Sequence, residues 1–134
     1  MTIVFLLFAY YKSPNTYMLG MPKEELVHYQ FADIIQETED ATLLNYGFLD
    51  AGFYTVSEVL PSERFFQMQN ISYEAFPEMM DSQDACIREQ RVDYVIVRGE
   101  DVPEWILKYY SIIQETRQVY EGANVQYILL KKNL

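Results

Sequence analysis

The chain has 134 residues, half of them hydrophobic and 16% aromatic, which is enough apolar material for one folded domain and excludes a disordered chain. Its formal net charge of −10 repels phosphate backbones at long range, which excludes nucleic acid as a partner. Cys86 is the only cysteine, which excludes an internal disulfide and a cysteine-based zinc site.

The chain begins with the apolar stretch MTIVFLLFAYY and has no charged side chain before Lys12. This stretch is shorter than the roughly 20 residues of a spanning helix and lacks the basic region and cleavage site of a signal peptide. Ile3 to Tyr10 is either a buried strand or helix of the globule, or the outer end of a transmembrane helix. Two tyrosines followed by a lysine favour a membrane boundary. We therefore expect residues 1–12 to end a transmembrane helix and residues 13–134 to form a single α/β globular domain.

The first predicted elements are an entry loop and an amphipathic helix. Residues 13–22 contain proline, asparagine and glycine, which indicates a loop. Pro22 predicts the start of a helix that runs to about Glu37. His28, the only histidine, is expected on this helix at the surface or at the edge of the core. The acidic run that follows, Glu37, Glu39 and Asp40, favours a solvated face over a divalent-metal site.

The middle of the chain predicts a strand, a short helix and a second strand. The apolar run Thr42–Tyr46, closed by a glycine, indicates a buried strand. Asp50 has the position of a helix cap for a short helix over Ala51–Val59. Arg64–Met68 is a further strand candidate.

A second helix and the clearest strand of the sequence come next. Pro77 predicts the start of a helix to about Gln90. The residues expected on its inner side are Met79, Met80, Gln83, Cys86 and Ile87. Val92–Val97 is continuous, β-branched and apolar, which is typical of a strand covered on both faces. Pro103 then predicts a short helix with Trp105 packed inward.

The last third predicts two strands, Ser111–Tyr120 and Val125–Lys132, joined at the sequence EGAN. A helix over Tyr109–Tyr120 stays open, because its apolar residues also fit a period of 3.6. The elements together predict an α/β fold. We expect a three-layer Rossmann-like arrangement, with a partly parallel sheet and an antiparallel C-terminal hairpin.

The loop after the first strand is the candidate binding site, because ligands of α/β sheets bind outside the carboxyl ends of strands. Gly47 and Gly52 have the spacing of P-loop glycines, but Phe53 stands where the lysine would be. The pattern favours a structural turn, with both glycines at positive φ, over polar ligand recognition. The candidate binding residues are Asn45, Tyr46, Asp50 and Tyr54, with Arg98 after the central strand as an anion contact.

No catalytic signature is found in the sequence. There is no G-x-S-x-G motif and no G-x-G-x-x-G fingerprint. Cys86 and His28 lie on separate predicted helices, without an orienting partner. We therefore assign no catalytic residue, no metal ligand and no cofactor, and whether the chain is an enzyme stays open.

Three stretches carry a family resemblance: KEELVHYQFADII, ATLLNYGFLDAGFYTVSEVLPSERFFQMQNI and QRVDYVIVR, followed by a tyrosine-rich hairpin. They resemble the extracytoplasmic carboxyl-terminal domain of bacterial multi-spanning glycosyltransferases of the GT-C type, which use lipid-linked sugars. The likeness covers Ser13 to the end and includes no catalytic motif. It implies that transmembrane helices precede the domain and that the catalytic and sugar-donor sites belong to that membrane part.

The resemblance implies a non-catalytic accessory domain on the extracytoplasmic face of the bacterial cell membrane. The parent enzyme would be a hexosyltransferase that builds cell-surface polysaccharide or glycosylates wall polymers. The expected partners are its membrane portion and a glycan acceptor or lipid-linked sugar. Two alternatives stay open: a stand-alone Rossmann-like nucleotide-sugar-binding protein or enzyme, and a protein-interaction module that docks through its apolar first segment.

Overall fold

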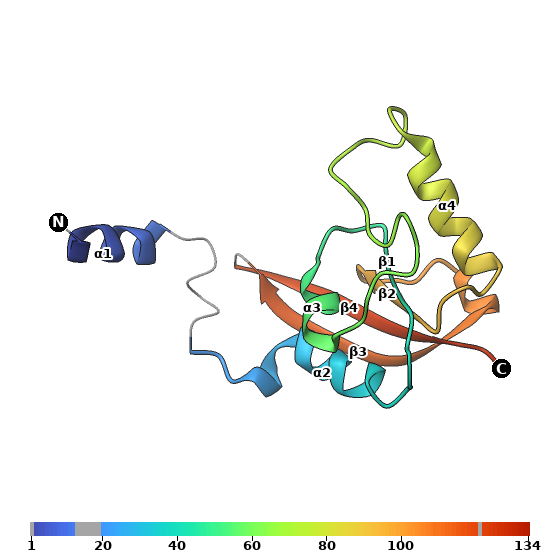
Figure 1. The fold of residues 1–134 in the computed structure, drawn as a ribbon, viewed down its shortest axis with the longest axis horizontal. Coiled ribbons are helices and arrows are strands. Elements are labelled where there is room, and N and C mark those ends of the chain that lie inside the picture. Colours follow the sequence, from blue (N-terminus) through green and yellow to red (C-terminus); the bar gives the residue numbers. More distant parts are fainter. Residues whose placement is uncertain (1, 13–19, 121) are drawn as a thin grey trace.

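The computed structural model of the chain describes residues 2–12, 20–120 and 122–134. Its centre is a four-stranded mixed sheet in the order β1-β2-β4-β3 (Figure 1). β1 (Leu43–Tyr46) pairs in parallel with β2 (Tyr94–Arg98), and β2 pairs antiparallel with β4 (Ala123–Lys132). β3 (Tyr110–Tyr120) lies antiparallel to β4 at the edge. The predicted α/β class, the partly parallel sheet and the terminal hairpin are confirmed, and the helical alternative for Tyr109–Tyr120 is wrong.

Helices, turns and a long irregular segment, residues 58–76, connect the strands. The α-helices are α1 (Thr2–Lys12), α2 (Val27–Ile35), α3 (Gly52–Ser57) and α4 (Pro77–Arg88), and short 3-10 helices cover Lys23–Glu25 and Ile106–Lys108. α4 begins at Pro77 as predicted, because proline at the first helical position loses no hydrogen bond. The predicted first helix is divided at Leu26, whose backbone is extended.

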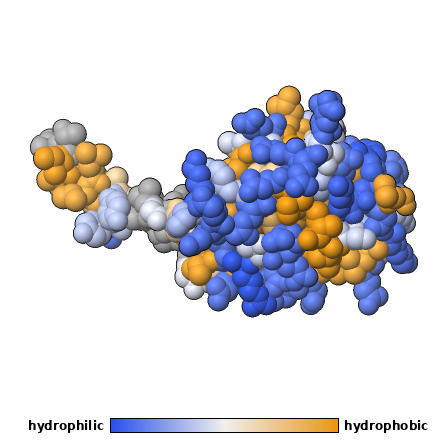
Figure 2. All heavy atoms as spheres, turned by 90° about the horizontal axis from the view of Figure 1, so that it is seen from below, coloured by the Kyte–Doolittle hydropathy of each residue, from blue (hydrophilic) through white to orange (hydrophobic). Residues whose placement is uncertain are grey.

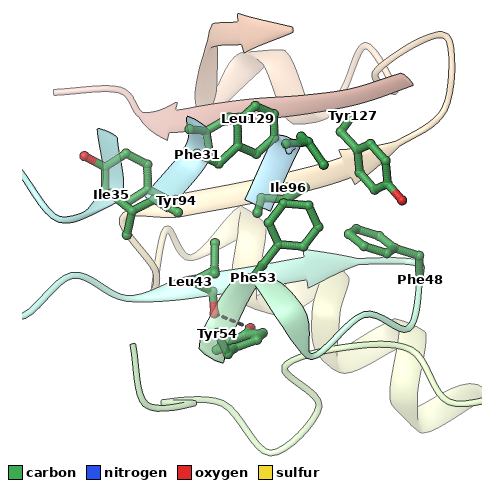
Figure 3. Close-up of a cluster of buried hydrophobic side chains, with 11 residues drawn as sticks. Phe31, Ile35, Leu43, Phe48, Phe53, Tyr54, Tyr94, Ile96, Tyr127 and Leu129 are labelled. Atoms are coloured by element: carbon green, nitrogen blue, oxygen red, sulfur yellow. Dashed lines mark hydrogen bonds between the residues drawn. The ribbon is translucent and has the colours of Figure 1, made fainter. Parts of the chain in front are cut away.

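The alternation of side chains along the strands separates two hydrophobic clusters, one on each face of the sheet. On the first face, α2 and α3 pack on Leu43 of β1 and on the even-numbered residues of β2 (Figure 3). This cluster comprises Val27, Phe31, Ile35, Leu43, Phe48, Phe53, Tyr54, Tyr94, Ile96, Tyr127 and Leu129. On the second face, Cys86 and Ile87 of α4 and Ile106 pack on the intervening strand residues.

Two predicted elements are wrong in detail. Arg64–Met68 forms no strand; it makes isolated backbone bonds from Asn45 N to Phe66 O and from Met68 N to Phe48 O. The first bond lies at the outer edge of β1 and the second at the loop after it, so no ladder forms. The helix expected around Pro103 is reduced to a turn and one 3-10 helix.

The apolar first segment forms α1, which stands apart from the sheet (Figure 1). Its large hydrophobic side chains are between 51% and 78% exposed, and they gather as one apolar surface on the projecting helix (Figure 2). None of the helices in the described ranges combines the length and hydropathy needed to cross a bilayer. The predicted entry loop falls mostly on residues 13–19, which lie outside the described residues.

Candidate functional site

The candidate site lies where the parallel strands β1 and β2 end, at the loop that joins β1 to α3. Gly47 turns the chain there with φ of +76°, a conformation that glycine adopts without strain. Gln83 of α4 holds this turn, because its Oε1 accepts from Gly47 N at 3.0 Å and its Nε2 donates to Phe65 O at 2.9 Å. The loop is therefore fixed from beneath by a buried amide.

Asp50 and His28 form the polar centre of the loop. His28 Nε2 lies 2.9 Å from Asp50 Oδ2, and the other carboxylate oxygen accepts from Gly52 N at 2.9 Å. The imidazole packs on the ring of Phe53 with 4.3 Å between centroids. The side chains of His28 and Asp50 are 16% and 24% exposed, so the pair lies at the surface of the core.

Gly52 is needed for close approach rather than for a positive φ. A Cβ at this position would lie 2.9 Å from Asp50 Oδ1 and 2.9 Å from His28 Cδ2. Gly52 is absent from the residues with positive φ, so the prediction that both glycines adopt that conformation is wrong for Gly52. Its missing side chain is what lets helix α3 begin beside the Asp50–His28 pair.

The surroundings of Asp50 stabilise its charged form. Burial alone would raise the pKa of this carboxyl group. The hydrogen bond and charge of His28, the Gly52 N–H and the charge of Arg98 together outweigh burial and lower the pKa below its ordinary value. The carboxylate therefore stays ionised as an acceptor at neutral pH.

Asn45 lies beneath this pair and supports it. Its Nδ2 donates to the backbone oxygen of Asp50 at 2.6 Å, and the residue is fully buried. Its Oδ1 has no hydrogen-bond partner among the described residues. Because Asn45 is buried, a ligand in solution cannot contact it directly. Its role is to hold the loop in place through the bond to Asp50, while Asp50 and His28 are the partly exposed polar groups.

The two predicted tyrosines occupy different environments. The Tyr54 hydroxyl is buried and lies 2.7 Å from Leu43 O and 2.8 Å from Phe66 O (Figure 3). Tyr46 lies on the opposite face of the sheet, where its hydroxyl donates to Asp84 at 2.9 Å and its ring meets Trp105 edge-on. The structure therefore does not bring Tyr46 together with the other four predicted residues.

Arg98 ends β2 and completes the exposed part of the site. It is exposed, and its guanidinium lies 5.9 Å from the centroid of Tyr127, whose ring packs on Phe48 of the loop. The charge of Arg98 also acts on Asp50. This end of the sheet thus presents a partly buried carboxylate, a partly buried imidazole and an exposed guanidinium, which can donate and accept hydrogen bonds to a polar ligand.

His28 is the residue that sequence analysis missed in this site. It was expected at the surface or the edge of the core, which is where it lies, but not beside Asp50. The two residues are 22 positions apart, and no local spacing relates a helix residue to a loop after the next strand. The available signal was that His28 and Asp50 are both polar residues beside predicted core segments.

A cleft of about 780 Å³ opens at the other end of β1. It is lined by residues 35–36, 38–42 and 57–60. Its carboxylates are Glu39, Asp40 and Glu58, so an acidic ligand would be repelled there. No group of three metal-ligating side chains with the geometry of a metal site occurs in the described parts of the chain, this cleft included.

Comparison of the chain with protein-family models, with curated proteins and with solved structures finds no match.

Proposed function

We propose that this chain is a non-catalytic accessory domain on the extracytoplasmic face of a bacterial membrane. There it adjoins the membrane portion of a glycosyltransferase that uses a lipid-linked sugar. The observation that carries the proposal is α1, a helix that is apolar on all sides and stands apart from the sheet, with none of its described residues in either hydrophobic cluster. The glycosyltransferase assignment rests on the sequence resemblance.

The exposed surface of α1 consists mainly of large hydrophobic side chains. A helix that is hydrophobic all round is stable only when an apolar medium or a protein core surrounds it. At about 1.5 Å per residue its 11 residues measure about 16 Å, roughly half of a bilayer's hydrocarbon thickness. Burial of six side chains, Ile3, Val4, Phe5, Leu6, Leu7 and Phe8, favours insertion by on the order of 10 kcal/mol.

The residues at the end of α1 support an orientation in which the aliphatic part lies in the lipid and the globular domain lies in water. Tyr10 and Tyr11 follow the aliphatic part, and Lys12 is the only basic residue of its last turn. Amphipathic rings and a lysine favour the headgroup region, so the globular domain would begin where water begins. The chain's net charge of −10 disfavours a surface rich in anionic lipid.

The loop between β1 and α3 is where a glycan would bind. The exposed Arg98 and the partly exposed Asp50 and His28 offer polar groups for sugar hydroxyls. Asn45 and Tyr54 fix the loop from beneath. Tyr46 would contribute only through the opposite face, beside Trp105. No step of a reaction is assigned to these groups.

We also infer that the fold is a small Rossmann-like, three-layer arrangement. What supports this is the parallel β1–β2 pair, together with the two hydrophobic clusters that cover opposite faces of the sheet. α2 and α3 belong to one cluster and α4 to the other. A sheet of only four strands with one parallel pair is the reduced form of that design.

Co-flotation with phosphatidylcholine vesicles tests the proposed membrane attachment. The wild-type chain is expected to float with lipid, because α1 inserts. Leu6→Asp combined with Leu7→Asp should remain with the soluble fraction, with binding weakened at least about a hundredfold. Leu60→Asp is the matched control, because Leu60 is also exposed but lies on the globular domain. A wild-type chain that stays soluble with lipid in excess would overturn the proposal.

Saturation-transfer NMR with short glycans tests the sugar contact separately. Transfer is expected in the wild-type chain and should be lost in Arg98→Ala. Arg64→Ala is the control, since Arg64 is also an exposed arginine and its ion pair is with Glu78 rather than with Asp50. No transfer from the wild-type protein would discard the sugar contact while leaving membrane attachment intact.

A further inference from the structure

The two edges of the sheet are treated differently. At the β1 edge, residues 65–68 close the backbone: Asn45 N donates to Phe66 O, and Tyr54 and Gln83 add side-chain bonds to β1 carbonyls. At the β3 edge, no backbone group of residues 111–119 bonds to any other described element than β4. A long open edge of this kind is a template for another strand.

The side chains of β3 are suited to a partner strand rather than to water. Ile113 and Val119 are 40% and 48% exposed. Within a chain of net charge −10, residues 110–120 contain one acid, Glu115, and one base, Arg117, so the strand itself is neutral. The edge is therefore the part of the sheet where two copies would approach with little charge repulsion.

We propose that β3 pairs antiparallel with β3 of a second copy of this chain, about a two-fold axis at Thr116. In this register Glu115 of each copy faces Arg117 of the other, which gives two opposite-charge pairs beside the pair that Arg117 makes with Glu100 of its own copy at 2.8 Å. Ile113 faces Val119, and Thr116 faces its own copy. Each kind of pair is favourable across antiparallel strands. The sequence from residue 113 to residue 119 is thus complementary to itself when reversed.

The neighbouring registers of the two strands pair like charges, or an apolar side chain with a charged one. Centring the axis on Glu115 places two carboxylates opposite each other, and centring it on Arg117 places two guanidinium groups there. Centring it on Gln114 sets Ile113 against Glu115. Because like charges directly opposite each other are destabilising, the axis at Thr116 is the register that the charges select.

The bulge in β3 limits how many residues can pair regularly between the two copies. The pairing with β4 shifts between Ile112 and Gln114, so the regular strand begins at Gln114. Bulges usually protect an edge by bending it away from a partner. Here the bulge lies at one end, and the self-complementary part lies almost entirely beyond it. Gln30 of α2 meets Thr116 Oγ1 at 2.9 Å, so α2 would flank the axis on one face.

Disulfide trapping tests the geometry directly in the full chain. Thr116→Cys should form a disulfide-linked dimer under mild oxidation, because opposed residues of antiparallel strands lie about 4.5–5.5 Å apart, within disulfide range. Ser111→Cys is the matched control on the same strand, since its two copies would lie about 34 Å apart. The native Cys86 is buried and does not compete. Equal cross-linking of the two variants would overturn the proposal.

Charge reversal tests the register by sedimentation equilibrium without lipid. Glu115→Arg or Arg117→Glu alone should weaken the dimer about tenfold, because each creates like-charge pairs. The two changes together should restore it. A wild-type chain that stays monomeric, or single changes without effect, would contradict the proposal.

Association through α1 must be separated from association through β3. The same measurements on full-length Leu6→Asp/Leu7→Asp protein should leave the dimer unchanged. If those substitutions abolish the dimer, the joint belongs to α1 and the β3 proposal is wrong. Vesicle binding of the wild-type chain is unaffected by that outcome, so the two proposals fail independently.

Discussion

At the residue scale, the Asp50–His28 pair stabilises the folded chain more at neutral pH than in acid. The pKa of Asp50 is lowered in the folded chain, because His28, the Gly52 N–H and Arg98 outweigh burial. A lowered folded pKa stabilises the protein above the unfolded pKa, near about 4, and that stabilisation is lost as pH falls through the folded value. The pair therefore contributes at neutral pH and not in strong acid.

Asp50→Asn should lower the free energy of unfolding by about 1–2 kcal/mol at pH 7, since it removes the charge that His28 and Arg98 face. The difference from wild type should shrink as pH falls below about 4. Urea unfolding at a series of pH values measures it. Asp33→Asn, on the exposed side of α2, is the control and should show no such dependence. A constant difference at all pH values would contradict this assignment.

Individual residues of the site were predictable to different degrees. Gly47 was predictable, because a glycine directly after an apolar strand indicates a turn with positive φ. Gly52 was not, since its role depends on the approach of His28 from an earlier helix, which only the tertiary fold creates. Tyr54 lies on the predicted short helix, but its hydroxyl points to backbone carbonyls in the interior. The orientation of this side chain depends on packing, which the sequence does not show.

At the element scale, the hydroxyl of Tyr54 in α3 links residues 65–68 to the edge of β1, because it lies within hydrogen-bond distance of both Leu43 O and Phe66 O. Tyr54→Phe should cost about 1–2 kcal/mol of unfolding free energy, because the Leu43 and Phe66 carbonyls lose the one hydroxyl that lies within hydrogen-bond distance of both. The backbone N–H of Asn45, which donates to Phe66 O, should exchange its hydrogen with solvent faster in Tyr54→Phe than in the wild-type chain. Tyr73→Phe is the matched control: its hydroxyl meets Asp81 at the surface, and the expected change is within about 0.5 kcal/mol. Equal effects of both substitutions would disprove the edge-fastening role.

α4 should protect its cysteine from reagents. Cys86 is buried against the sheet, and burial together with the nearby charge of Glu63 raises the pKa of the thiol to about 12. Because the thiolate is the reactive form, the folded chain should not react with a thiol-specific reagent at pH 8, and should react fully in denaturant. Rapid labelling of the native protein would show that α4 does not pack as described.

The elements that the sequence predicted well are those with local signals. β2 follows from a continuous β-branched run, and α4 follows from Pro77 and its inner stripe, of which Met79, Gln83, Cys86 and Ile87 are buried. Arg64–Met68 was mistaken for a strand because its apolar composition reflects contact with β1, not a ladder. The β3 bulge leaves no local sequence signal, since it depends on pairing with β4.

At the scale of the whole molecule, the chain consists of an α/β domain with a mostly hydrophilic surface that carries hydrophobic patches, and an apolar helix that stands apart from it (Figure 2). Composition predicted the folded domain, and the uncharged start of the sequence predicted an apolar element. Composition could not predict whether that element joins the core, because continuous apolar residues suit a buried strand equally well. In the structure α1 packs no side chain into either hydrophobic cluster.

The central claim, insertion of α1 into lipid, is tested most directly by the depth of a label on it. An environment-sensitive fluorophore attached at Leu6→Cys should shift to the blue on phosphatidylcholine vesicles and be quenched by nitroxide lipids. The same fluorophore at Leu60→Cys, on the globular domain, should stay in water and escape quenching. If the label at position 6 stays in water with lipid in excess, α1 does not anchor the domain and the proposed membrane role is wrong.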